Sequence, residues 1–119
     1  MKPIVAILII AYSCSASADV TKTQKPEVAH LLNFVKTSSC EINRNGTYHK
    51  GSEAVSHIEK KYDYFRDKIN TTEEFIEYSA TKSAISGKYY SVRCGNGEVI
   101  KTKEWLLNEL KIYREIKRT

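Results

Sequence analysis

The sequence predicts an α+β domain in which four helices pack on a small antiparallel sheet of two or three strands. Three observations lead to this fold class. Four segments repeat apolar residues at spacings of three and four, the period of a helix with one buried face. Shorter segments alternate apolar and polar residues beside Gly-containing turns, as strands do. Two cysteines, Cys40 and Cys94, lie on the apolar side of two such segments and predict one disulfide.

The composition is that of a globular protein. Of the 119 residues, 41% are hydrophobic and 28% are charged, which excludes collagen and a long disordered polymer. The net charge of +5 is spread along the chain, so nucleic acid is not predicted as a partner. The sequence contains no nucleotide-binding loop, metal-finger spacing or nucleophile elbow, and we predict neither a cofactor nor a metal.

Residues 1–18 have the pattern of a secretory signal peptide. Lys2 gives a positive start, residues 3–11 form an apolar run, and small side chains precede Asp19. The apolar run is less than half the roughly twenty residues that a membrane-spanning helix needs. We therefore expect cleavage between Ala18 and Asp19.

Cleavage at this point leaves a single domain, residues 19–119, in the periplasm or outside the cell. The alternative is a lipoprotein anchored through Cys14, which follows the apolar run. The bulky Tyr12 disfavours that alternative, because lipoprotein processing prefers small or aliphatic residues there.

The first predicted helix spans residues 26–37. Pro26 suits a first helical turn, and apolar residues follow at helical spacing: Val28, Leu31, Leu32 and Val35. His30 falls opposite this apolar stripe, so we expect its side chain to be solvated.

A hairpin is predicted next. Cys40 and Ile42 alternate with polar neighbours as in a strand, and Asn45-Gly46 then forms a turn because both residues tolerate positive φ. Residues 47–49 are expected to return as a brief partner strand.

Two further helices follow the hairpin. Ser52 is predicted to cap the first of them, whose buried face carries Val55, Ile58, Tyr62, Phe65 and Ile69. Thr71 and Glu74 form a capping box that begins the second, and residues 83–87 form the loop after it.

Strands and a closing helix complete the domain. Residues 89–94 place Tyr90, Val92 and Cys94 on one side of a strand. Residues 95–97 form a turn, and residues 98–100 can add a third strand. The last helix, residues 103–117, buries an apolar face that contains Trp105, Leu106, Leu110 and Tyr113.

Pairing the two cysteine-containing strands would bring both sulfur atoms to the same face of the sheet. In an oxidising compartment such an isolated pair usually closes, and the bridge stabilises the fold by about 4 kcal/mol in the chain-entropy model. A catalytic cysteine would need a free thiolate, which export disfavours.

A combination of residues along the domain carries a family resemblance: Ser39-Cys40, Arg44-Asn45-Gly46, Ala54, His57, Lys61-Tyr62, residues 72–76, Ala80-Thr81, Ser83, Ser86-Gly87 and Tyr90. In this combination the chain resembles the YfeK-like family of small exported bacterial proteins, a domain of unknown function. The similarity extends from about Val28 to Tyr113, and Tyr89 stands where the family usually places Pro. The resemblance implies a periplasmic location and no particular activity.

Several polar residues are predicted to converge on one binding pocket. Arg44 and Asn45 end one strand, Ser86 and Gly87 precede its partner, and His57 lies on the intervening helix. Such donors can bind an anion, a glycan or a peptide terminus. The alternative is structural, with turn residues at Asn45 and Gly87 and with Arg44 or His57 bonded to buried carbonyl groups.

Aromatic residues outside the predicted core are further candidates for recognition: Tyr48, Tyr64, Tyr78 and Tyr89. A metal site is not predicted, because His49 and His57 have no carboxylate or thiolate companion at ligand spacing.

The leading functional hypothesis is therefore a non-enzymatic exported protein that binds a ligand or another envelope component. Its expected partner is an envelope protein, a peptide or a glycan, and we expect a monomer. The alternative is a small periplasmic hydrolase that uses His57 with a nearby serine such as Ser86, which requires the imidazole and the hydroxyl to be about 3 Å apart.

Overall fold

The computed structural model describes residues 19–95 and 97–118. Within these residues the chain forms four α-helices, one 3-10 helix and four strands. In chain order they are α1 (Lys25–Thr37), β1 (Glu41–Arg44), β2 (Thr47–Lys50), α2 (Gly51–Phe65), η1 (Arg66–Lys68), α3 (Thr72–Ala80), β3 (Ser91–Cys94), β4 (Glu98–Lys101) and α4 (Thr102–Arg118). The α+β fold class is confirmed. The predicted signal peptide lies outside the described residues.

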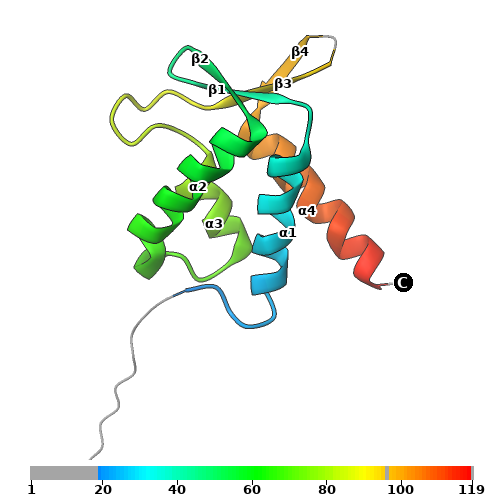
Figure 1. The fold of residues 1–119 in the computed structure, drawn as a ribbon. Coiled ribbons are helices and arrows are strands. Elements are labelled where there is room, and N and C mark those ends of the chain that lie inside the picture. The colour runs from blue at the N-terminus through cyan, green and yellow to red at the C-terminus, as the bar shows by residue number, and fades with distance from the viewer. Residues whose placement is uncertain (1–18, 96, 119) are drawn as a thin grey trace, which may run out of the picture.

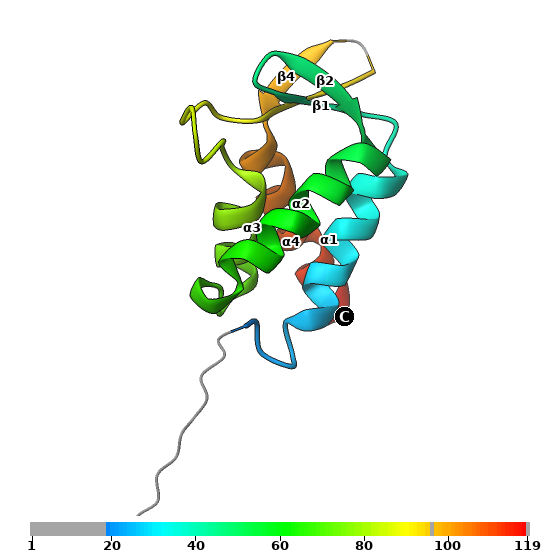
Figure 2. The same ribbon diagram turned by 60° about the vertical axis from the view of Figure 1, so that its left-hand side comes forward.

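The sheet lies across one end of the helices (Figure 1). Its strand order is β2-β1-β3-β4, and each neighbouring pair is antiparallel. The sheet has four strands where two or three were predicted, because both short segments beside the turns pair along their whole length. α2 contacts both α1 and α3, while α4 contacts the same two helices (Figure 2).

The predicted disulfide joins Cys40 and Cys94. In the register of β1 with β3, Ile42 pairs with Val92 and Glu41 pairs with Arg93. The two cysteines therefore stand opposite each other where the two strands end, with their Cα atoms 4.2 Å apart. Their sequence separation of 54 means that the bridge closes a long loop.

The N-cap of helix α2 is Lys50, two residues before the predicted cap Ser52. The start of this helix lies against α1. A Cβ atom on Gly51 would lie 2.1 Å from the carbonyl oxygen of Val35, so only glycine fits where the start of α2 meets the end of α1. At its other end α2 stops at Phe65, and Ile69 is buried beyond the helix.

The capping box of α3 is confirmed. The Glu74 amide donates to the Thr71 hydroxyl at 3.1 Å, and the Thr71 amide donates to the Glu74 carboxylate at 3.2 Å. The two side chains satisfy backbone donors that the first turn of a helix leaves unpaired.

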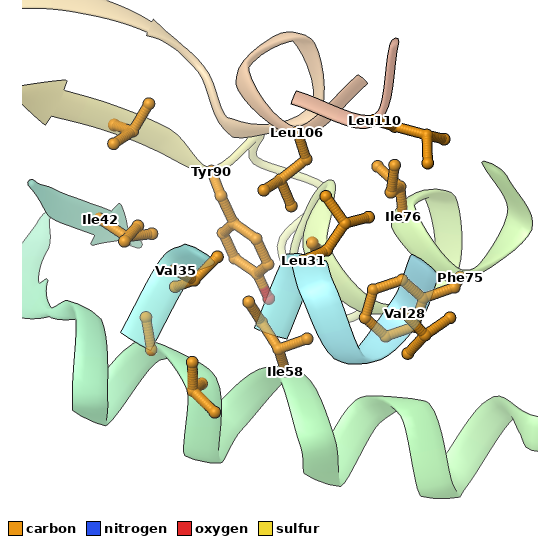
Figure 3. Packing of buried hydrophobic residues seen from close by; sticks show 14 of the residues in the cluster. Val28, Leu31, Val35, Ile42, Ile58, Phe75, Ile76, Tyr90, Leu106 and Leu110 are labelled. Carbon is orange, nitrogen blue, oxygen red and sulfur yellow. The ribbon is translucent and has the colours of Figure 1, made fainter. Parts of the chain in front are cut away.

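The core lies between the helices and the adjacent face of the sheet (Figure 3). All four helices and two segments of the sheet region contribute to it. The labelled side chains are Val28, Leu31, Val35, Ile42, Ile58, Phe75, Ile76, Tyr90, Leu106 and Leu110, all buried. This apolar packing stabilises the fold by removing side chains from water.

The expected solvation of His30 is met only in part, because its side chain is 32% exposed and also contacts α4. Its Nε2 atom lies 2.6 Å from a carboxylate oxygen of Glu109, and its ring stacks on Tyr113 with centroids 4.2 Å apart. The cause is α4, which packs along α1 and covers the side of the helix that the sequence pattern left polar.

The first described residues are anchored to the domain. The Asp19 carboxylate accepts hydrogen bonds from the Tyr62 hydroxyl at 2.6 Å and from the Arg66 guanidinium at 2.9 Å. Val20 is only 3% exposed and belongs to the core. None of the helices in the described part of the chain is long and apolar enough to cross a membrane.

Candidate functional site

Five residues from different elements meet beside one end of the sheet, and we call them the Tyr90 cluster: Arg44, His49, His57, Lys61 and Tyr90. Arg44 ends β1, and His49 lies on β2 opposite Ile42. His57 and Lys61 are four residues apart on α2, so they share a face of that helix. Tyr90 directly precedes β3 and is 4% exposed.

The hydroxyl of Tyr90 joins two members of the cluster. The ammonium of Lys61 donates to it at 3.2 Å, and Nε2 of His57 lies 3.3 Å away. An ammonium has no acceptor, so the Tyr90 oxygen must accept from Lys61. The tyrosine proton is then available to Nε2 of a neutral His57. Lys61 makes a second hydrogen bond, to the carbonyl oxygen of Lys82 at 2.5 Å.

Burial and positive charge together keep His57 neutral. Burial is the larger cause, the charge of Arg44 comes next and that of Lys61 follows, and these lower the pKa of His57 to about 4. Burial and then the charge of Arg44 also lower the pKa of Lys61. Burial raises the pKa of Tyr90. The cluster is therefore an environment in which added positive charge is unfavourable.

Arg44 and Lys61 have no acidic partner among the residues that the structure describes. The nearest polar contact of Arg44 is Nε2 of His49, at 3.5 Å. By contrast, the guanidinium groups of Arg66, Arg93 and Arg114 each form ion pairs with carboxylates. An arginine of a folded domain that lies among other cations without a carboxylate is unusual, because like charges destabilise the native state.

A small, mostly enclosed cavity adjoins the cluster. Polar and apolar side chains both line it: Ile42, Arg44, His49, Ala54, His57, Ile58, Ala80, Tyr90 and Thr102. Thr102 is 1% exposed, and its hydroxyl has no hydrogen-bond partner in the described part of the chain. A buried hydroxyl without a partner is an exception to the usual pairing of polar groups in protein interiors.

A hydrogen bond connects the hairpin turn to the loop that precedes β3. The Ser86 hydroxyl donates to the side-chain oxygen of Asn45 at 2.8 Å. Asn45 and Gly46 have φ values of 53° and 91°, as a tight turn between two strands requires. Gly87, the neighbour of Ser86, has a φ of 74°, which glycine adopts readily.

The residues predicted for one pocket therefore form separate groups. Arg44 and His57 belong to the Tyr90 cluster, while Asn45 and Ser86 bond to each other at the surface. Tyr89 is 52% exposed, and the ammonium of Lys101 lies 4.5 Å from its ring centroid.

The geometry that a serine hydrolase would need is not formed. The hydroxyl that lies near the His57 imidazole belongs to Tyr90, and the hydroxyl of Ser86 is bonded to Asn45. Among the described residues no hydrogen bond joins His57 to Ser86. The same part of the chain contains no group of three or more His, Cys, Asp or Glu side chains that could hold a metal ion.

Sequence reasoning missed His49, Lys61 and Tyr90 as members of the site. A usable signal existed for Lys61, because it lies four residues after His57 and so shares its helix face. Tyr90 was assigned to the core from its alternation with Val92, and its ring is indeed buried. The role of its hydroxyl depends on α2 packing beside the sheet, which the sequence pattern does not specify.

Comparisons with known proteins agree on one family. Residues 22–114 match the model of a family described as a family of unknown function (DUF5329). The chain is also similar to a protein of Salmonella typhimurium (strain LT2) named uncharacterized protein YfeK. The two are 35% identical over 92 residues, which cover 76% of this chain and 77% of that protein. No solved structure matches the chain.

Proposed function

The chain belongs to the DUF5329 family and is similar to YfeK, as expected from the sequence, and we propose that it is an exported, non-enzymatic binding module. Its proposed contact surface is the Tyr90 cluster, together with the exposed residues of the neighbouring turn and loop, Asn45, Ser86, Gly87 and Tyr89. The proposed partner is a peptide, a glycan or another protein of the cell envelope.

Three observations support export. Residues 1–18 have the pattern of a signal peptide, and a disulfide joins Cys40 to Cys94, which is typical of oxidising compartments. The contacts of Asp19 and Val20 with the domain are compatible with cleavage directly before Asp19, because they use the side chains of those two residues.

The observation that carries the binding proposal is a pair of cations that pair with no carboxylate among residues 19–95 and 97–118. Arg44 and Lys61 are half-buried beside the buried Tyr90. A purely structural arginine is usually paired or hydrogen-bonded to buried carbonyl groups. Arg44 has neither type of partner among the described residues, so its position is better explained by a ligand that supplies the missing acceptor.

Binding is favoured over hydrolysis by the state of His57. An imidazole with a pKa of about 4 is a weak base, and its hydroxyl neighbour is a tyrosine whose pKa is raised by burial. Neither group is activated as a nucleophile or as a general base near neutral pH. Both groups instead present fixed hydrogen-bonding atoms, which suit recognition of a ligand.

Defined peptide and glycan arrays test the binding proposal. The oxidised protein, residues 19–119, is expected to bind at least one array member saturably. Arg44→Gln is expected to weaken this binding by about tenfold or more, the effect of losing a charge-assisted hydrogen bond. Arg93→Gln is the matched control, because Arg93 is paired with Glu41 outside the cluster. Absence of any saturable ligand, or equal binding by wild type and Arg44→Gln, would contradict the proposal.

Intact-mass analysis tests export independently. The full sequence is expressed in a Gram-negative host, and the recovered periplasmic fraction is expected to contain a chain that begins at Asp19 with its disulfide closed. A chain that retains residues 1–18, or one that carries lipid on Cys14, would show that the expected cleavage is wrong.

A further inference from the structure

We infer that the chemical group recognised by the Tyr90 cluster is an oxyanion, a carboxylate or a phosphate, which the Arg44 guanidinium and the Lys61 ammonium bind together. The inference rests on the proposed binding function and names the ligand chemistry of that same site.

The cluster has a surplus of hydrogen-bond donors. A guanidinium carries five N–H groups and accepts nothing, and the only polar contact of Arg44 in the described residues is the 3.5 Å approach to His49. Lys61 has three N–H groups, of which two bond to Lys82 and Tyr90. A ligand that satisfies these donors must therefore be rich in acceptor atoms.

The electrostatic environment selects an anion over a neutral acceptor. The charges of Arg44, Lys60 and Lys61 all act on His57, which places several cations within Coulombic reach of one imidazole. Glu53 is the acidic neighbour of His49, at 3.6 Å, but its side chain is 64% exposed and lies outside the cavity lining. A neutral sugar hydroxyl would leave the repulsion among the cations unchanged, whereas an oxyanion would offset it.

The arrangement of the donors fits a carboxylate or a phosphate. Arginine binds either group through two parallel N–H donors, and lysine adds a point charge from a second direction. Arg44 comes from the sheet and Lys61 from α2, so the two cations reach the site from different layers of the fold (Figure 1). The two charges are close enough for Arg44 to lower the pKa of Lys61, so one anion can interact with both.

The cavity beside the cluster has a volume of about 10 Å³, room for about one water molecule, so an oxyanion must lie outside it. Arg44, His57 and Tyr90 line it together with Thr102, whose buried hydroxyl lacks a partner in the described part of the chain. Next to Arg44 in the chain, the Asn45 side chain accepts a hydrogen bond from Ser86, which joins the hairpin turn to the loop before β3. The oxyanion would bind at the solvent side of this cavity, because Arg44 and Lys61 are only half-buried.

NMR titration of isotope-labelled protein, residues 19–119 with the disulfide intact, tests the inference. Sodium phosphate and sodium acetate are the probes, and sodium chloride at equal ionic strength corrects for screening. At about pH 7 the Arg44 side-chain and His57 ring signals are expected to shift saturably with at least one of the two oxyanions. In the saturated complex the pKa of His57 is expected to rise from about 4 by about one unit or more, because an anion favours the imidazolium.

Four variants locate the effect. Arg44→Gln is expected to abolish the saturable shift, and Arg44→Lys to weaken it because the paired donors are lost while the charge remains. Arg93→Gln is expected to behave as wild type. If Arg44→Gln does not fold, Lys61→Met tests the same site and is also expected to abolish the saturable shift.

The two probes distinguish the source of the anion. A response to phosphate alone indicates a phosphorylated ligand, and a response to acetate alone indicates a peptide terminus or an acidic sugar. Shifts that match those in chloride, or that persist in Arg44→Gln, would overturn the inference. An Arg44-dependent ligand on the arrays without a response to either anion would refute the oxyanion and leave the binding proposal standing. An Arg44-dependent response to an anion without any array ligand would support the oxyanion site and contradict the proposed binding of a peptide or glycan.

Discussion

Nε2 of His57 lies 3.3 Å from the hydroxyl oxygen of Tyr90, and the two rings meet edge to face with centroids 6.0 Å apart. The contact places the imidazole beside a phenol in a neighbourhood of cations. A proton added to His57 would put a positive charge beside Arg44 and Lys61 in a partly buried place. Protonation of His57 is therefore coupled to the stability of the fold.

His57 is expected to make the protein less stable as the pH falls below about 6.5. The pKa of His57 is about 4 in the folded protein and 6.5 in the unfolded chain, so the unfolded chain binds more protons between pH 4 and 6.5. The stability that His57 contributes is present above pH 6.5 and is lost progressively as the pH falls towards 4. Urea unfolding of wild type and His57→Gln across this pH range measures the free energy of unfolding of each protein. As the pH falls, wild type should lose stability relative to the variant. A difference in free energy that does not change with pH would contradict the neutral state of His57.

Gly51 is expected to tolerate no side chain. Gly51→Ala would place a methyl group 2.1 Å from the Val35 carbonyl oxygen, and the forced displacement of α1 from α2 should cost about 1–3 kcal/mol. The free energy of unfolding in urea measures this cost. Ser52→Ala is the matched control, since Ser52 is exposed and does not cap α2, and it should change stability by less than about 0.5 kcal/mol. A loss of about 1 kcal/mol in Ser52→Ala would instead indicate a cap.

The disulfide is expected to supply a large part of the stability. Replacing Cys40 and Cys94 by alanine should lower the free energy of unfolding by about 2–5 kcal/mol, out of a total of about 5–15 kcal/mol for a domain of this kind. Chemical unfolding of the double variant gives the value, and wild type kept in excess reductant should show a similar loss. Equal stability of the oxidised and reduced proteins would mean that the bridge adds nothing to the fold.

Much of the fold could be predicted from the sequence because its signals are local. The apolar spacing of Val28, Leu31 and Val35 defines the buried face of α1, and Thr71 with Glu74 marks the first turn of α3. Strand alternation, together with the expected export of a domain that contains two cysteines, predicted the pairing of Cys40 with Cys94. These features depend on the period of one element or on the chemistry of one turn.

The site was harder to predict because it depends on how separate elements meet. Arg44 and His57 were identified as polar residues near one strand end, but the grouping with Lys61 and Tyr90 follows from the packing of α2 beside the sheet. The same limitation explains why the contact of His30 with Glu109 was not predicted, since the two residues are 79 positions apart in the sequence. A hydrophobic pattern shows which face is buried and does not show which polar groups become neighbours.

Removal of the Arg44 charge separates a binding role from a structural one most directly. If Arg44 is held without a carboxylate so that it can receive a ligand, Arg44→Gln in chloride buffer should be at least as stable as wild type, because repulsion within the Tyr90 cluster is relieved. The pKa of His57 should also rise in the variant. A fall of more than about 1 kcal/mol in the free energy of unfolding of Arg44→Gln would contradict this account and would show that Arg44 supports the fold itself.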